Sequence, residues 1–265
     1  MKHSFYCALF AGALLAAPVP AAENADKPAS LADLPAGTTE AVGQGFAEPR
    51  EDGVLRVLIV GSGDAHNFPR YWLQMDGETL REAGGIDTAA TPNLDEALEL
   101  LPQADVLVFS GNHRQYGEAR FQQALNAFAD QGGGLVMLHA ATWVHPWEGY
   151  NSRFVGGGSR GHGFMDVEVT VKNTDHPVMR GVPESFTITD ESYHHEFEDG
   201  AEYELLAENG PDDRTRKPHA SVWVKTDDKA RIVCITHGHD ARAHENPAYR
   251  TMLVNAVRWV AENGE

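Results

Sequence analysis

Short apolar runs that end in a small or polar residue recur through the first half of the chain. Each is apolar along its whole length instead of alternating, which is typical of strands covered on both faces of a parallel sheet. These runs lie at Arg56–Gly61, Asp105–Gly111 and Gly134–His139. Apolar residues with helical spacing lie at Tyr71–Ala83, Leu94–Leu101 and Glu118–Gln131. The alternation predicts a βαβαβαβ unit and a doubly wound, parallel sheet.

The pattern changes in the second half, where the apolar segments are shorter and more alternating. They lie at Val167–Val171, Phe186–Ile188, Tyr203–Leu206 and Ser221–Val224. A buried strand at Arg231–Thr236 and an amphipathic helix at Pro247–Ala261 then close the pattern. We therefore expect an α/β fold with a doubly wound, mostly parallel sheet and added, antiparallel strands in the second half.

The N-terminus has the form of a secretory signal. Met1-Lys2-His3 precedes an apolar run, Phe5–Ala17, that is too short to span a membrane, and small residues follow at Val19–Ala22. We expect a signal peptide at 1–22, an extended segment at 23–53 and one domain at 54–265. This organisation predicts a periplasmic or secreted protein, with an uncleaved membrane anchor as the alternative.

Net charge limits the classes of ligand and partner, and the cysteine content limits disulfide bonds. The formal net charge is −18, and removal of residues 1–22, which hold one lysine and no acidic residue, moves it to −19. Such a charge disfavours nucleic acid, anionic membranes and polyanionic substrates, so a neutral small molecule is expected. The sequence leaves open whether the protein forms homo-oligomers. Cys7 leaves with the signal, so Cys234 has no partner for an intramolecular disulfide.

Acid-base residues gather in one segment, Asp190-Glu191-Ser192-Tyr193-His194-His195. Further histidines follow the predicted strands, where ligands bind in open α/β sheets. They are His66, His113, His139, His237 and His239. Both patterns predict a polar active site at the carboxyl ends of the strands. By contrast, we expect His145, His219 and His244 on the surface.

Alternate residues of a strand share a face, which separates the candidates in this segment. Glu191 and Tyr193 are expected to face the ligand, and Asp190 to orient a neighbour from the other face. His237 and His239 would point the same way if their strand continued through them. No cofactor is expected, but zinc bound by His237, His239, Glu191 and His194 is an open alternative.

Five motifs in order, from Leu55 to the C-terminus, resemble the ThuA-like, or trehalose-utilisation, family. They are Gly132–Ala141, Phe154–Gly157 with His162, Asp175–Pro177 with Gly181, Asp190–Tyr193, and Gly238–Asp240 with Asn255–Trp259. The resemblance implies a flavodoxin-like, class I glutamine amidotransferase-like fold. It also implies a role in the catabolism of trehalose-like or oxidised disaccharides. The chain departs from the family pattern at Gly158–Gly163, where an aromatic residue near Ser159 and a proline at Gly163 would be expected.

Amidotransferase relatives of this fold carry a nucleophilic cysteine at a sharp strand-to-helix turn. Here that turn reads Leu138-His139-Ala140-Ala141, so glutamine hydrolysis through a thioester and ordinary serine hydrolysis are both disfavoured. His139 therefore joins Glu191, Tyr193 and His239 as a catalytic candidate. Trp143, Trp147 and Tyr150 follow the turn and could form a platform for a sugar ring. The expected ligand contacts are His66, His113, Trp143, Trp147, Arg160, His162, Asp190 and His194.

We expect acid-base catalysis on a trehalose-like or 3-keto sugar: elimination, isomerisation or hydrolysis. A carbonyl at C3 makes the C2 proton acidic, so a base and an oxyanion stabiliser suffice. His139 or His239 would take the proton, Tyr193 or His162 would stabilise the enediolate, and Glu191 would protonate the leaving oxygen. The alternatives are a metal-dependent hydrolase and a sugar-binding module without catalysis.

Overall fold

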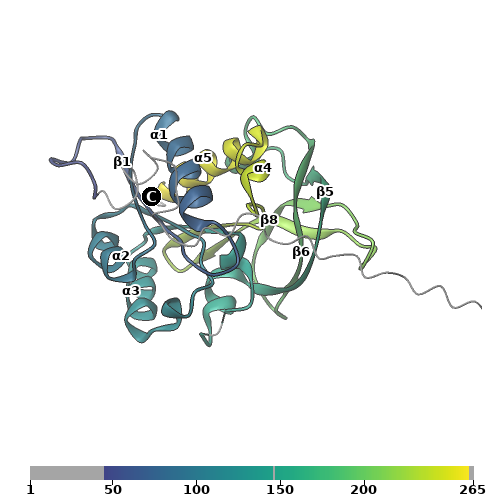
Figure 1. Cartoon of the computed structure of the whole chain (residues 1–265), viewed down its shortest axis with the longest axis horizontal. Helices are drawn as coiled ribbons and strands as arrows, with labels where there is room; N and C mark the ends of the chain where they lie inside the picture. The colour runs from purple at the N-terminus through teal and green to yellow at the C-terminus, as the bar shows by residue number, and fades with distance from the viewer. Residues whose placement is uncertain (1–44, 146, 263–265) are drawn as a thin grey trace, which may run out of the picture.

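One mixed sheet of nine strands forms the centre of the molecule, in the order β2-β1-β3-β4-β9-β8-β7-β5-β6. Figure 1 shows β5 and β6 at one end of the molecule and the helices α2 and α3 at the other. The computed structural model describes residues 45–145 and 147–262. The expected signal peptide and most of the segment 23–53 lie outside the described residues. Within them, no helix has both the length and the apolar character needed to cross a membrane.

The parallel half of the sheet contains the three strands that apolar runs mark in the first half of the sequence, together with β2 and one strand from the end of the chain. These are β1 (Leu55–Val60), β2 (Ile86–Thr91), β3 (Val106–Phe109), β4 (Gly134–Leu138) and, from the end of the chain, β9 (Ala230–Ile235). All residues of β3 and β4 are buried, as expected for strands covered on both faces. The alternation requires β2, but its sequence, Ile-Asp-Thr-Ala-Ala-Thr, lacks the large apolar residues that marked its neighbours.

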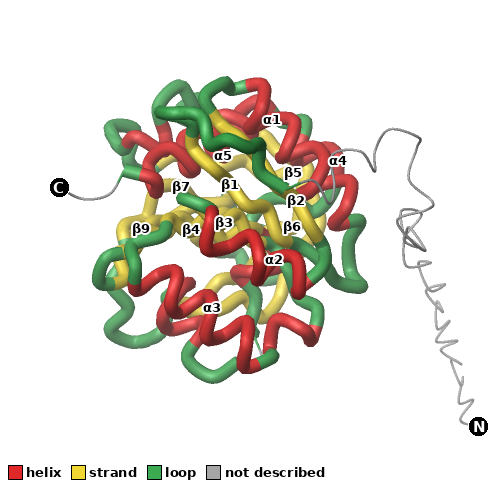
Figure 2. The backbone as a smooth tube through the Cα atoms, turned by 90° about the vertical axis from the view of Figure 1, so that its left-hand side faces the viewer, coloured by secondary structure: helices red, strands yellow, loops and turns green. Residues whose placement is uncertain are grey.

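Helices cover both faces of this half (Figure 2). A π-helical segment, η2 (Pro69–Asp76), leads into α1 (Gly77–Glu82), which packs on one face together with α5 (Pro247–Ala261). On the other face lie α2 (Leu94–Leu100) and α3 (Ala119–Asp130). The remaining helical segments are short: η3 (Leu101–Gln103), η4 (Arg114–Gly117), η5 (His139–Thr142), η6 (Asn151–Val155), η7 (Pro177–Met179) and α4 (Ala241–His244).

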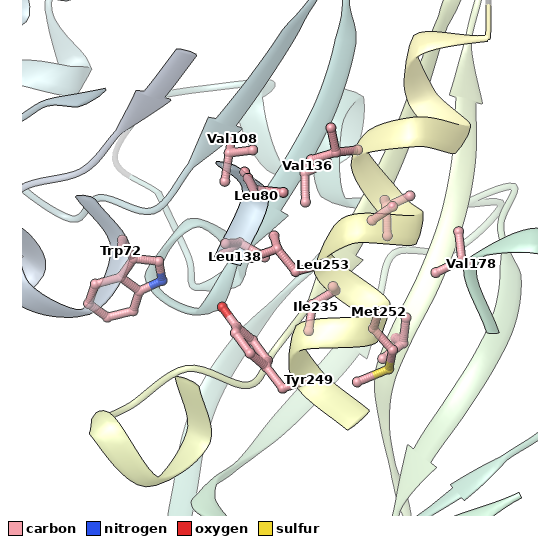
Figure 3. Packing of buried hydrophobic residues seen from close by; sticks show 14 of the residues in the cluster. Trp72, Leu80, Val108, Val136, Leu138, Val178, Ile235, Tyr249, Met252 and Leu253 are labelled. Carbon is pink, nitrogen blue, oxygen red and sulfur yellow. The ribbon is translucent and has the colours of Figure 1, made fainter. Parts of the chain in front are cut away.

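The core between α5 and the sheet is apolar (Figure 3). Asn246 caps α5 by accepting a hydrogen bond from the Ala248 N–H, and Pro247 occupies its first turn, so the helix begins at a defined residue. Leu253 is fully buried in the same cluster as Leu138 and Ile235. Each such leucine contributes about 1.5–3 kcal/mol by leaving water. This packing fixes α5 across the strands that lead into the site.

The antiparallel half consists of β5 (Gly157–Val171), β6 (Ser185–Phe197), β7 (Glu204–Asn209) and β8 (His219–Asp227). The predicted α/β class, with a mostly parallel first half and added antiparallel strands, is confirmed. The predicted strand Val167–Val171 is only the last part of β5, and the predicted strand Phe186–Ile188 is only the first part of β6. Both strands continue as a long two-stranded ribbon, with a register shift between Ser159 and His162. This ribbon brings several polar residues to the ends of the parallel strands.

Candidate active site

The turn after β4 places His139 at the centre of a buried polar cluster. Its backbone adopts a φ of 42°, a strained value for a residue with a side chain, and the chain then enters η5. The His139 side chain is fully buried, and its Nδ1 lies 2.7 Å from the Thr236 carbonyl oxygen. Its other nitrogen, Nε2, lies 3.3 Å from Glu191 Oε2. The turn therefore aims an imidazole at a carboxylate.

The β5–β6 ribbon presents four side chains to this histidine from one face. His162 pairs with Tyr193, and Phe164 pairs with Glu191, in the antiparallel register. Residues directly opposite each other share a face, as do alternate residues along each strand. His162 Nδ1 lies 3.2 Å from Glu191 Oε1, and the Tyr193 ring centre lies 4.6 Å from that of His139.

Asp190 acts from the opposite face of β6, on the segment that carries His239. Its two carboxylate oxygens accept hydrogen bonds from the backbone N–H groups of Gly238, at 2.7 Å, and His239, at 3.1 Å. The prediction that Asp190 orients a neighbour agrees with this geometry. His239 Nδ1 in turn lies 3.2 Å from Glu191 Oε1. The carboxylate of Glu191 is therefore in close contact with three imidazoles, from the β4 turn, β5 and the segment after β9.

A fourth imidazole completes the cluster. The His66 ring, from the segment after β1, lies 4.8 Å from the His139 ring and 4.9 Å from the His239 ring, measured between centres. One ligand atom from each of His66, His139, Glu191 and His239 lies within 4.8 Å of the others. We call these four residues the central cluster. Their donor set, imidazole nitrogen and carboxylate oxygen, is one that transition metals accept.

The electrostatics of the cluster keep Glu191 charged. Burial alone would raise the pKa of Glu191, but the neighbouring imidazoles of His139 and His239 outweigh it and hold the pKa well below its usual range. A carboxylate that keeps its charge is a poor proton donor, so this result does not support the expected role of Glu191 in protonating a leaving oxygen. Burial alone would lower the pKa of His239, but the carboxylate of Glu191 outweighs burial and raises it.

Two other groups stay neutral. Burial, together with the imidazoles of His139 and His239, lowers the pKa of His66 to about 2. Burial raises the pKa of the Tyr193 hydroxyl well above its ordinary value, and the charge of Glu191 adds to this effect. Tyr193 is therefore available as a hydroxyl donor, and His66 as a neutral ligand or acceptor.

Aromatic side chains flank the cluster on two sides. The Trp143 ring lies 5.1 Å from the Tyr193 ring and 5.9 Å from the His162 ring. Phe164, which the sequence analysis did not identify, lies 5.1 Å from the His239 ring and is 46% exposed. The only clue in the sequence was its place two residues after His162, directly after the segment Gly158–Gly163 that departs from the family pattern.

The predicted aromatic platform is wrong for two of its three members. Tyr150 is fully buried, and Trp147 packs against Tyr150 and Phe154 with ring centres 5.4 and 5.8 Å apart. Trp147 and Arg160 line a separate pocket of about 300 Å³, which no member of the central cluster lines. Only Trp143 keeps the predicted position beside the site, next to Tyr193 and His162.

Three histidines predicted at the site point elsewhere. The His113 imidazole caps η4 by accepting a hydrogen bond from the Gln115 N–H. His194 contacts Asp212 and stacks on His219, which makes a second group of possible metal ligands. His237 Nε2 donates a hydrogen bond to Asn209.

The predicted metal set of His237, His239, Glu191 and His194 is therefore not brought together. His237 and His239 do not share a direction, because β9 ends at Ile235 and Gly238 has a φ of 131°, which breaks the strand alternation. His194 directly follows Tyr193 in β6 and so faces away from it.

The prediction of three surface histidines was also wrong. His145, His219 and His244 are 8%, 4% and 1% exposed. The His145 ring stacks on the Tyr150 ring, with 4.3 Å between ring centres. His219 Nε2 lies 2.7 Å from the Thr215 hydroxyl oxygen. His244 donates from Nε2 to the Gly238 carbonyl, while its Nδ1 lies 2.6 Å from Asp76. Local sequence cannot reveal such burial, because the partners are far away in the chain.

Comparisons with known proteins agree on the fold. The sequence profile of the family described as ThuA, trehalose utilisation, matches residues 56–260. A ThuA-like protein from Parabacteroides merdae has a TM-score of 0.67 at 17% identity, over 79% of this chain and 90% of that one. Another, from Bacteroides uniformis, has a TM-score of 0.64 at 21% identity, over 82% and 95%.

An amidotransferase-type relative is also similar in fold. A Thermoplasma acidophilum protein, described as one component of a GMP synthase, has a TM-score of 0.52 at 15% identity, over 80% of this chain and 96% of that one. At these identities the likeness establishes the fold alone. No curated protein matches the chain.

Proposed function

Because the chain belongs to the ThuA, trehalose utilisation, family, we propose that it acts in sugar catabolism on a trehalose-like or 3-keto sugar. The proposed chemistry is proton transfer without a covalent serine or cysteine nucleophile. One observation carries this proposal: the carboxylate of Glu191, in β6, is within 3.3 Å of imidazole nitrogens from His139 at the β4 turn, His162 and His239. Groups that accept and donate protons converge where relatives of the fold place a nucleophile.

Exposure assigns roles within this group. The His162 side chain is 43% exposed, that of His239 is 23% exposed and that of His139 is fully buried. His162 is therefore the group that reaches a bound sugar most directly, and His239 is the second. His139 keeps one nitrogen on the Thr236 carbonyl, which suits it to hold the cluster in place instead.

The proposed reaction begins with loss of a proton next to a carbonyl. An imidazole removes the C2 proton of a 3-keto sugar, and the electron pair moves to the carbonyl oxygen as an enediolate. The Tyr193 hydroxyl, with its raised pKa, donates a hydrogen bond to that oxygen. The imidazolium formed in this step then returns its proton. Transfer to another carbon gives isomerisation, whereas transfer to the C1 oxygen, as its bond to C1 breaks, gives elimination.

The walls of the site support a sugar as the ligand. Trp143 lies beside Tyr193 and Phe164 lies beside His239, and both offer apolar faces of the kind that pack against the C–H face of a pyranose. The net charge of −18 also suits a neutral ligand.

Two alternative functions predict different outcomes for the sugar. A hydrolase would split the glycosidic bond without exchanging the C2 proton. A sugar-binding module would bind through Trp143 and Phe164 and change no bond, and its histidines would be replaceable.

Proton NMR in heavy water tests the proposal. A 3-keto-disaccharide is incubated with the protein, with the His162→Gln variant and with buffer alone. We expect loss of the C2 proton signal with the wild-type protein and a large decrease in its rate with the variant. His176→Gln, a control near the Trp259 ring and away from the cluster, should exchange at the wild-type rate. Cleavage without exchange would favour the hydrolase, and line broadening alone would favour the binding module.

We also infer export to the periplasm or the medium, from the signal-like sequence of residues 1–22. N-terminal sequencing of protein from the periplasmic fraction tests this point. A mature chain that begins just after Ala21 or Ala22 would support it, and an intact Met1 in the cytoplasm would contradict it.

A further inference from the structure

We propose that the central cluster, His66, His139, Glu191 and His239, binds one divalent transition-metal ion of the zinc type. This set differs from the metal ligands that the sequence suggested. It joins residues from the segment after β1, the turn after β4, strand β6 and the segment after β9. Binding of the ion does not depend on which substrate the protein takes.

Hydrogen-bond accounting at His139 gives the first argument. Its Nδ1 lies 2.7 Å from the Thr236 carbonyl oxygen, which can only accept, so Nδ1 carries the ring proton. In a neutral imidazole Nε2 then presents a lone pair, and it lies 3.3 Å from Glu191 Oε2, another acceptor. Two lone pairs at this distance repel unless a proton or a metal ion lies between them. A backbone carbonyl on the far nitrogen is also the usual support of a metal-bound histidine.

Unpaired nitrogens give the second argument. His139 Nε2 and His239 Nδ1 are both buried, and neither has a hydrogen-bond partner among the described residues. Both nevertheless lie within 3.3 Å of the Glu191 carboxylate. Buried polar atoms without partners are rare and call for a bound group.

The spacing of these atoms fits one central ion. A tetrahedral ion with bonds of about 2.1 Å places its ligand atoms about 3.4 Å apart. Glu191 Oε2 lies 3.3 Å from His139 Nε2 and Glu191 Oε1 lies 3.2 Å from His239 Nδ1, so each carboxylate oxygen is about one such edge away from one imidazole nitrogen. A proton would satisfy only one pair of these atoms, whereas an ion satisfies all four ligands together. Three imidazoles and one carboxylate are a donor set that zinc accepts.

Two histidines next to the cluster remain outside this ligand set. His162 also contacts Glu191 but is the most exposed of the group, so it stays free to move protons. His244 holds the Gly238 carbonyl from behind and does not contact the four ligands. An ion in the cluster would polarise the carbonyl oxygen of the sugar, and this part of the inference rests on the proposed function.

Direct metal binding is the test. The protein is purified without metal-affinity resin, stripped with EDTA and titrated with Zn²⁺ and Co²⁺ by calorimetry, with element analysis of the product. We expect one ion for each chain at this site. Glu191→Gln and His66→Gln should each weaken binding at least tenfold and change the visible spectrum of bound Co²⁺.

Asp212→Asn is the matched control, because it removes a carboxylate oxygen from the second group, His194, Asp212 and His219, and leaves the central cluster intact. Asp212 Oδ1 accepts hydrogen bonds within its own loop, and asparagine keeps that acceptor. If Asp212→Asn abolished binding while Glu191→Gln and His66→Gln kept it, the proposal would be overturned. Failure of the wild-type protein to bind Zn²⁺ or Co²⁺ at millimolar concentrations would also overturn it.

Circular dichroism of each variant separates lost binding from lost folding. His66→Gln is the safer variant, because His66 is only half-buried and lies in a loop. Binding of the ion without proton exchange in the sugar would leave the metal site standing and contradict the proposed function. If the stripped protein exchanged the C2 proton at the full rate, the proposed function would stand, and the ion would have no role in catalysis.

Discussion

Asp190 and Glu191 are neighbours in the chain but serve one site from opposite faces of β6. Glu191 contacts the His239 ring, while Asp190 accepts hydrogen bonds from the backbone N–H groups of Gly238 and His239. Consecutive strand residues point in opposite directions, so the two carboxylates could not have done the same task. One positions the backbone of the segment after β9, and the other meets its imidazole.

Asp190→Asn should disturb this segment without touching the ligand. The amide would place a donor against the Gly238 N–H, which leaves a buried donor unpaired and costs about 1–3 kcal/mol. We expect a lower free energy of unfolding in urea and a shifted NMR titration of the His239 ring. Asp213→Asn, at an exposed position, is the control and should change neither quantity. An unchanged His239 titration in Asp190→Asn would show that Asp190 does not position it.

Gly238→Ala should be more harmful than an ordinary glycine substitution. Gly238 has a φ of 131°, far from the positive values of about 50–70° that a residue with a side chain can adopt. An added Cβ would lie at ordinary contact distances, 3.4 Å from Trp72 Nε1 and 3.5 Å from His244 Nε2. Backbone strain alone costs about 1–3 kcal/mol. The control is Gly84→Ala, which has a positive φ but no atom within 4 Å of the added Cβ. The melting temperature should fall further for Gly238→Ala, because the φ of 72° at Gly84 is close to the left-handed region and the φ of Gly238 is not. Equal losses in the two variants would contradict this prediction.

Acid should destabilise the protein through His145. Burial lowers its pKa from 6.5 to about 4. Above pH 6.5 both folded and unfolded states hold it neutral; between pH 6.5 and 4 only the unfolded state gains the proton. Stability therefore falls as pH falls through this window, by about 3 kcal/mol at most, at about 1.4 kcal/mol per pH unit.

Urea unfolding at several pH values checks this effect. His145→Phe should flatten the slope between pH 6.5 and 4, because the ring that resists protonation is gone. His113→Gln replaces a half-buried histidine and should keep the wild-type slope. A slope in His145→Phe as steep as that of the wild-type protein would assign the acid sensitivity to other groups.

Phe164→Ala should weaken sugar binding with little loss of stability. The ring is 46% exposed and stands beside His239, with the Arg242 guanidinium 4.8 Å from its centre. Aromatic stacking contributes about 0.5–1.5 kcal/mol, so KM for the keto-sugar should rise roughly twofold to tenfold. Val144→Ala, which shortens another exposed apolar side chain, is the control. A change in kcat alone would place Phe164 in catalysis instead of binding.

The sequence predicted the sheet because burial leaves a local pattern. β3 and β4 are apolar throughout, and α5 shows helical spacing, so both could be located from neighbouring residues. The residues Glu191, Tyr193, His139 and His239 were also identified correctly as neighbours, through their motif and their positions at strand ends. Their contacts confirm that these four lie together.

Long-range geometry was beyond local patterns. The sequence of β5 around Gly157–Gly163 has no alternation, so its pairing with β6, and hence the place of Phe164, could not be inferred. The direction of His237 depended on where β9 ends, and a single positive φ at Gly238 decided it. The burial of His244 depends on Asp76, which lies in η2 and is distant in the sequence.

The position of β9 has a consequence for synthesis. This strand is close to the C-terminus, yet it occupies the fifth place of the nine and joins β4 on one side to β8 on the other. A nascent chain that lacks it has two unpaired strand edges and cannot bring His239 to Glu191. Such edges recruit other chains, so an incomplete chain is prone to aggregation. Folding of the sheet and assembly of the site must therefore wait for the last strand, and a chain truncated before Ala230 should have neither.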